Sequence, residues 1–202
     1  FIISNESIFF REGKYFCDNL DMKSTPEGLN KNYEVNLIAR KSKKMRFHQI
    51  EVNSVQIFNS VLTFLISILK SIKNSNTKFL IISITPYTFL ACILLKFLKK
   101  KPIVYLRSDG YGEYKAILGI IGPPIYHFMF SIVSKISHLI SCKEYILRGR
   151  KGYLVSPSQI DEKWFKNLKS SKFEKIKLLY VGRIRKEKGI NSLVKLIKNF
   201  DK

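Results

Sequence analysis

Short apolar runs alternate with longer stretches in which apolar residues recur at helical spacing. The short runs predict strands, at residues 1–4, 33–40, 47–52, 78–84, 102–106, 153–156 and 178–181. Helices are expected from Ser54 as N-cap to about Lys73, from Thr85-Pro86 to 101, within 120–140 after Pro123-Pro124, and from Ile190 onward. The stretch 5–32 predicts only a loop and a poor helix.

The alternation of strands and helices predicts an α/β fold, with a parallel sheet covered by helices on both faces. Ligands of such sheets bind at the carboxyl ends of the strands. This rule selects four segments of the larger part of the chain: 4–13, 83–87, 107–114 and 156–161. It selects residues 182–189 separately, after the last expected strand.

The segment 178–190 combines a buried strand, a glycine, a basic loop and an amphipathic helix. A turn from strand to helix presents free backbone N–H groups and the positive end of a helix dipole, which suits an anion. Gly182 has no Cβ where a ligand would approach the backbone, while Arg183 and Lys188 add two cations. The pattern therefore predicts a diphosphate site, although an ordinary strand–loop–helix with solvated basic residues has the same local features.

Two short motifs in this segment, Val181-Gly182-Arg183 and Glu187-Lys188-Gly189, resemble the start of the C-terminal domain in family 4 ("group 1") glycosyltransferases with the GT-B fold. The resemblance implies that Arg183 and Lys188 bind the phosphates of a nucleotide-sugar donor, with Gly182 and Gly189 shaping the loop. Both domains of that fold are Rossmann-like. The implied division is an N-terminal acceptor-side domain (1–162), a linker (163–175) and the first strand–helix unit of the donor domain (176–202).

Residues 155–161 are similar to the Val-x-Pro-Asn-Gly-x-Asp pattern that precedes the linker in this family. Pro157 and Asp161 match, whereas Ser158 and Gln159 depart from Asn-Gly. A structural turn is therefore favoured here over a donor contact, and Asp161 stays a candidate cleft residue. Enzymes of the family are nearly twice as long as this chain, so we expect a fragment that is inactive by itself.

The loop after the strand at 102–106 supplies the candidate catalytic residues. By resemblance, Ser108 occupies the place of a family histidine that approaches the transferred sugar, and Asp109 is expected to accept hydrogen bonds from sugar hydroxyls or to orient the acceptor. Glu113 is a second carboxylate nearby. An ordinary solvated turn explains the loop equally well. Gly13 is interpreted as a remnant of the glycine loop that follows the first strand in relatives.

The activity implied by the resemblance is transfer of a sugar from a nucleotide-diphosphate donor to a glycan or lipid-linked acceptor, with retention, in the synthesis of cell-surface polysaccharide or glycolipid. No cofactor or metal is expected, because the family needs none and the chain has no Asp-x-Asp motif. The cysteines and histidines show no metal-ligand spacing either. The cysteines are scattered and odd in number, which argues against a disulfide framework and fits a reducing cytoplasm. These residues are Cys17, Cys92, Cys142, His48, His127 and His138.

The formal net charge of +21 favours anionic partners. Part of this charge accompanies a general enrichment in Lys, Asn and Ile, which has a compositional origin as readily as a functional one. A nucleic-acid module is not expected, because no zinc finger, RNP pattern or helix-turn-helix is present. The basic segments 41–46, 99–101 and 148–151 predict loose attachment to the anionic inner face of the cell membrane.

The alternative reading is an integral membrane protein. Its spanning helices would lie near 55–72, 79–98 and 120–140, and 79–98 approaches the length needed to cross a bilayer. Polar residues such as Ser83, Thr85 and Thr88 interrupt this run and favour a strand followed by a helix.

Overall fold

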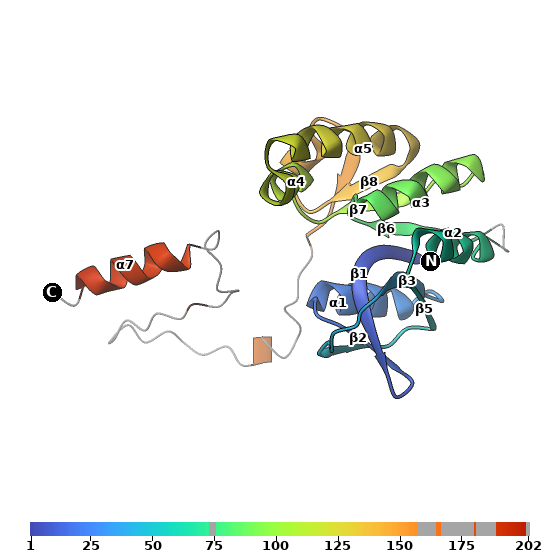
Figure 1. Ribbon diagram of the computed structural model, residues 1–202, viewed down its shortest axis with the longest axis horizontal. Coiled ribbons are helices and arrows are strands. Elements are labelled where there is room, and N and C mark those ends of the chain that lie inside the picture. Colours follow the sequence, from blue (N-terminus) through green and yellow to red (C-terminus); the bar gives the residue numbers. More distant parts are fainter. Residues whose placement is uncertain (73–75, 157–164, 167–179, 181–188, 201–202) are drawn as a thin grey trace. The chain divides into compact units, whose positions relative to one another are not determined.

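The computed structural model describes residues 1–72, 76–156, 165–166, 180 and 189–200. The chain divides into two compact units, Phe1–Gln159 and Ile160–Lys202. In the second unit the described residues include one helix, α7 (Ile190–Phe200), which begins at the expected residue (Figure 1). The first unit contains the sheet and the candidate catalytic loop.

The first unit is an α/β structure built on a nine-stranded sheet. Seven strands are mutually parallel in the order β5-β3-β1-β6-β7-β8-β9. Their bounds are β1 (Ile2–Arg11), β3 (Asn36–Lys41), β5 (Ser54–Phe58), β6 (Leu80–Ile82), β7 (Ile103–Leu106), β8 (His138–Ser141) and β9 (Gly152–Leu154). The α/β class is confirmed.

The sheet is mixed and not wholly parallel, which corrects the sequence prediction. Strand β1 runs past its parallel partners and turns at Glu12-Gly13 into β2 (Lys14–Cys17), which in turn pairs with β4 (His48–Ile50). Glu12 and Gly13 both have positive φ, 51° and 74°, as a two-residue type I′ hairpin requires. The segment 47–52 therefore forms a strand as expected, but an antiparallel one that pairs with β2 of this hairpin.

Two hydrophobic clusters fill the two faces of the sheet, because successive strand residues point to opposite sides. Ile3 and Ile38 belong to the cluster that includes side chains of α2 (Val61–Lys70), α3 (Pro86–Phe97) and α5 (Gly122–Ile136). Ile2 and Leu37 belong to the other cluster, together with Met22 of α1 (Leu20–Asn30). Full burial of a large aliphatic side chain contributes about 1.5–3 kcal/mol, so these clusters carry most of the stability.

Several expected elements are confirmed and others are wrong. Thr85 caps α3 with its side chain, and Pro86 occupies the first turn. Ser54 is not an N-cap: residues 54–58 pair with β3, and the cap of α2 is Ser60 in a capping box with Thr63. The helix expected through 140 ends at Ile136, since the next residues form β8 between β7 and β9.

One further α-helix and two 3₁₀ turns lie in stretches where the sequence did not predict them. The chain forms α4 (Gly110–Leu118) directly after the 107–109 loop, and the 3₁₀ turn η1 (Gly119–Ile121) connects α4 to α5. A second 3₁₀ turn, η2 (Glu144–Leu147), follows β8. The helices α4 and α5 pack against each other beside β7 and β8 (Figure 1).

Gly122 fixes the contact between α4 and α5. A Cβ added to Gly122 would overlap the backbone carbonyl of Tyr114. We therefore expect Gly122→Ala to lower the free energy of unfolding by about 1–3 kcal/mol, as overpacking does in other proteins. Urea denaturation followed by circular dichroism measures the effect.

Gly28→Ala in α1 is the matched control. A Cβ at Gly28 meets no atom within 4 Å. Alanine should raise the free energy of unfolding there by about 0.5–1 kcal/mol, because it restricts the unfolded chain and favours the helix. Equal effects of the two substitutions would contradict the close α4–α5 contact.

Candidate active site at the carboxyl edge of the sheet

The order in which the chain adds parallel strands to the sheet reverses between β1 and β6. The chain proceeds from β1 through β3 to β5 on one side, and from β6 through β7 and β8 to β9 on the other. Carboxyl ends of parallel strands share one edge of a sheet, and ligands bind in the crevice where the succession reverses. The chain leaves β6 at Ser83 with φ of 61°, a conformation that costs an L residue energy and concentrates at functional sites.

Asp109 lies at this edge, three residues after the end of β7, and is the N-cap of α4. Its carboxylate accepts a hydrogen bond of 3.2 Å from the backbone N–H of Tyr111. Arg148 donates to the same oxygen at 3.3 Å and forms an ion pair with it. The position of the Asp109 carboxylate is therefore fixed from two sides, and part of its role is structural.

Glu113 follows Asp109 by one helical turn. Its backbone N–H donates to the Asp109 carbonyl at 3.0 Å, which places both residues on neighbouring turns of the same helix start. Asp109 is half-buried and Glu113 is exposed. The structure thus brings the two predicted catalytic carboxylates together, and the half-buried Ser108 lies beside them in the chain. Their catalytic role stays a prediction.

A second chain of contacts links Arg148 to α5. The Arg148 guanidinium carbon lies 4.8 Å from the centre of the Tyr111 ring, within cation–π distance. The Tyr111 hydroxyl is 2.8 Å from His127 Nδ1, and Ser131 Oγ is 3.3 Å from His127 Nε2. Burial raises the pKa of Tyr111, while the charges of Arg148 and Arg150 act in the opposite direction. His127 lies exposed on α5.

Gly110 allows α4 to lie directly on the aromatic core. A Cβ at Gly110 would overlap the ring of Tyr126, which is almost fully buried. Tyr126 also contacts the rings of Tyr111 and Tyr114, with centroid distances of 4.9 and 5.2 Å. Desolvation raises the pKa of the Tyr126 hydroxyl, so it stays protonated at neutral pH. The helix that carries Asp109 and Glu113 thus has a rigid support.

Arg107 forms a separate ionic cluster at the point where the succession of strands reverses. Its guanidinium lies 3.6 Å from a carboxylate oxygen of Glu6 in β1 and 3.9 Å from one of Asp21 in α1. Within the described residues, Arg107 Nε and Nη1 and the buried Asn5 Oδ1 make no hydrogen bond. Buried polar atoms of this kind usually have a partner, so the cluster is the part of this edge best suited to meet a polar ligand group.

Glu6 and Asp21 were not identified from the sequence, because both lie in the 5–32 stretch that shows no clear periodicity. The carboxyl-edge rule does include Glu6, but a charged residue inside a strand gives no signal of its own. Asp21 follows Asn19, whose side chain caps α1 by accepting from the Asp21 backbone N–H at 3.1 Å. An Asn-x-Asp helix start is the only local signal for α1.

The remaining predicted site residues are not gathered at this edge. Gly13 occupies the tip of the β1–β2 hairpin, which projects away from α4 and α5 (Figure 1), and the turn itself explains its positive φ. Gly182, Arg183, Lys188 and Asp161 lie outside the described residues. Gly189 has a φ of 74° immediately before α7, and its carbonyl accepts from the Leu193 N–H at 3.0 Å.

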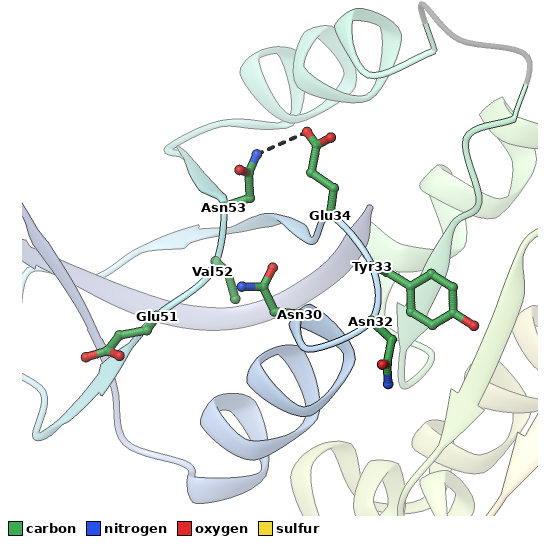
Figure 2. A pocket seen from close by; sticks show the side chains of 7 residues that line it. All are labelled: Asn30, Asn32, Tyr33, Glu34, Glu51, Val52 and Asn53. Atoms are coloured by element: carbon green, nitrogen blue, oxygen red, sulfur yellow. Dashed lines mark hydrogen bonds between the residues drawn. The ribbon is translucent and has the colours of Figure 1, made fainter.

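Two hollows lie away from the carboxyl edge. One, of about 710 Å³, is polar, and Figure 2 shows the Asn53 amide donating to Glu34 at 3.1 Å. Its lining residues are Asn30, Asn32, Tyr33, Glu34, Glu51, Val52 and Asn53. The other, of about 910 Å³, is mainly apolar and includes Phe1, Ile103 and Ile140. Both involve the amino ends of strands, where the carboxyl-edge rule places no ligand.

Comparisons with known proteins leave the function to be argued from the residues themselves. A scan against protein-family models and searches of curated proteins and of solved structures found no match to this chain. Within the part of the chain that the structure describes, no group of three or more His, Cys, Asp or Glu side chains is placed to hold a metal ion.

Two substitutions of Asp109 distinguish the stability that comes from its helix cap from the stability that comes from its charge. Asparagine caps a helix about as well as aspartate, whereas alanine costs about 1 kcal/mol. We expect Asp109→Ala to lower the free energy of unfolding by about 1–2 kcal/mol and Asp109→Asn by less than about 1 kcal/mol, the latter from the lost ion pair with Arg148. Urea denaturation tests this, and equal losses in both variants would contradict the capping role.

The three thiols should differ in reactivity at pH 8. Burial raises the pKa of Cys17 to about 11, with Glu6 adding to the effect, and burial raises that of Cys92 to about 12. A raised pKa leaves little thiolate, which is the reactive form. The half-buried Cys142, whose Sγ lies 3.2 Å from the Arg107 carbonyl oxygen, should be alkylated first.

Mass spectrometry after timed iodoacetamide treatment reads out the order of labelling. Protection of Cys17 and Cys92 should disappear in urea. Labelling of Cys92 as fast as Cys142 under native conditions would contradict the burial of α3 against the sheet.

Proposed function

We propose that this protein is a GT-B glycosyltransferase that moves a sugar from a nucleotide-diphosphate donor to a glycan or lipid-linked acceptor. The observation that carries the proposal is the strand–Gly-Arg–Glu-Lys-Gly–helix pattern of residues 178–190. The described start of α7 at Ile190, directly after the positive-φ Gly189, supports the helix that this pattern needs.

The topology of the first unit supports a Rossmann-like acceptor domain. Numbered along the chain, the parallel strands β5-β3-β1-β6-β7-β8 follow the order 3-2-1-4-5-6 of doubly wound dinucleotide-binding folds. The antiparallel extension formed by the end of β1, β2 and β4 is an addition to that strand order. Asp109, Glu113 and the Arg107 cluster belong to the edge where such folds bind ligands.

The proposed chemistry divides between the two units. Cleavage of the bond between the anomeric carbon and the diphosphate oxygen leaves negative charge on the diphosphate. Arg183, Lys188 and the N-terminus of α7 would stabilise that charge without a metal. An acceptor hydroxyl forms the new bond to the anomeric carbon and gives its proton to the departing diphosphate oxygen, with Asp109 and Glu113 as the carboxylates that orient the acceptor.

The integral membrane alternative has weaker support. Each of the stretches 55–72, 79–98 and 120–140 contains a strand as well as a helix. One helical run, Gly110–Ile136, is long and apolar enough to cross a bilayer. That run consists of α4, η1 and α5, and α5 folds back on α4 through the close approach of Gly122 to Tyr114.

Nucleotide binding tests the proposed donor site. We expect uridine, guanosine or adenosine diphosphate to bind in the presence of EDTA, and Arg183→Ala or Lys188→Ala to weaken that binding by about 10- to 100-fold. This range corresponds to a hydrogen bond to a charged group, about 1.5–3 kcal/mol. Isothermal titration calorimetry measures the affinities.

Arg185→Ala and Lys186→Ala are the matched controls, because they remove the same charges from the same loop at positions outside the motif. Each should change affinity less than about 3-fold, the effect of a general field. Equal losses in all four variants, or no binding of any of the three diphosphates, would overturn the proposed donor site.

A further inference from the structure

A continuous apolar segment lies exposed where α4 turns into α5. Residues 116–125, Ala-Ile-Leu-Gly-Ile-Ile-Gly-Pro-Pro-Ile, contain no polar side chain. We call this segment the apolar tip. Ile117, Ile120 and Ile121 are 75%, 90% and 63% exposed, so the largest side chains of the tip face away from the core. Soluble surfaces rarely carry contiguous apolar patches, and such patches usually mark an interaction site.

The tip is held rigidly by the fold. Its backbone reverses at Gly119, whose φ of 64° suits glycine, and Gly122 rests against the Tyr114 carbonyl. Tyr126, one residue after the tip, is almost fully buried among aromatic rings. The helices thus anchor the segment from below, and the exposed isoleucines cannot turn inward without breaking the α4–α5 contact.

Cations lie along α4, one beside the tip and others at the start of the helix. Lys115 immediately precedes it and is exposed in the last turn of α4. Arg148 stacks on Tyr111 of the same helix, and both Arg148 and Arg150 act on the Tyr111 hydroxyl. The facing acidic groups are Asp109, paired with Arg148, and Glu113. In the chain, Arg148 and Arg150 are flanked by the exposed residues Lys143, Glu144 and Lys151.

The combination of an apolar tip and cations along α4 fits one occupant best. An anionic bilayer offers an apolar interior for the isoleucines and negative headgroups for the cations at a slightly higher level. We propose that the apolar tip inserts into the acyl region of an anionic membrane, with Lys115, Arg148 and Arg150 bound at the headgroups. This inference is independent of the proposed sugar transfer.

The tip also fixes which part of the sheet would face the membrane. Helix α4 begins four residues after β7, and α5 ends two residues before β8 begins. The start of α5, and with it the tip, therefore lies toward the carboxyl edge of the sheet. Attachment by the tip would orient that edge, with Asp109 and Glu113, toward the headgroups.

Vesicle flotation at fixed lipid concentration tests the inference. The chain should float with vesicles of phosphatidylcholine and phosphatidylglycerol, and much less with phosphatidylcholine alone. The double variant I120E/I121E should lower the apparent partition coefficient by about 10-fold or more, because each change replaces inserted apolar surface by charge. Both side chains are largely exposed, so folding should be retained, as circular dichroism can verify.

Phe97→Glu is the matched control. Phe97 is 80% exposed at the end of α3, which precedes the amino end of β7 and so lies at the opposite edge of the sheet. It should leave flotation within about 2-fold of the unmodified chain. Equal losses for Phe97→Glu and for I120E/I121E would overturn insertion by the tip in favour of general apolar adhesion.

A depth measurement completes the test. Tryptophan introduced by Ile120→Trp in a Trp164→Phe background should be quenched by lipids brominated in the acyl chains. Absence of quenching in vesicle-bound protein would overturn insertion. Analytical sedimentation without lipid tests whether a second copy of the chain covers the tip instead. A dimer that I120E/I121E dissociates, with flotation unchanged, would assign the tip to such a dimer and overturn insertion. Nucleotide affinity should be unaffected by I120E/I121E, so this outcome is independent of the donor-site test.

Discussion

Strand β1 is the element on which the rest of the first unit depends. It pairs with β3 between Ile2 and Ile8 on one side and with β6 at residues 2–4 on the other, and its last residues, 9–11, pair with β2. Ile2 and Ile3 enter the two hydrophobic clusters on opposite faces of the sheet. The strand therefore joins the parallel sheet, both cores and the hairpin. These pairings also set the position, between β1 and β6, at which the order of the strands reverses.

The continuation of β1 past the parallel sheet also shapes the candidate site. In a doubly wound sheet the first strand normally ends at the carboxyl edge, and a glycine loop follows. Here the strand continues through Asn5 and Glu6, and Glu6 lies beside Arg107, which also pairs with Asp21. Side chains thus occupy the edge where a backbone loop would otherwise stand. A ligand at this point would meet ionised groups before it met backbone N–H groups.

The sequence predicts the elements whose signals are local and redundant. Helix α3 has a capping threonine, a proline in its first turn and a long apolar face, and its start is predicted to the residue. Strands β6 and β7 are short apolar runs between polar boundaries. Strand β8 is missed because Leu139 and Ile140 continue the apolar spacing of α5, and only pairing with β7 and β9 makes this segment a strand.

The candidate site is predicted less well than the fold, for a related physical reason. Asp109 and Glu113 are found because they follow a recognisable strand, but the contacts of Asp109 with Arg148 join residues 39 positions apart. The Arg107 cluster joins three separate elements, and no spacing in the sequence encodes it. Strand β5 shows the same limit on a smaller scale: Val55 and Ile57 suit a helix or a strand, and pairing with β3 decides.

Charge and apolar surface attract a protein to a membrane over different ranges. A net charge of +21 attracts any anionic surface, but salt screens that attraction beyond about 10 Å and it does not select one face. Insertion of an apolar tip is local and directional. Asp109 caps the nine-residue helix α4, which ends at Leu118. With a rise of 1.5 Å per residue, Asp109 lies about 13 Å along the helix axis from the exposed turn at Gly119. The length of α4 is an upper limit on their difference in height, so an inserted tip would keep both candidate carboxylates within about 13 Å of the inserted turn.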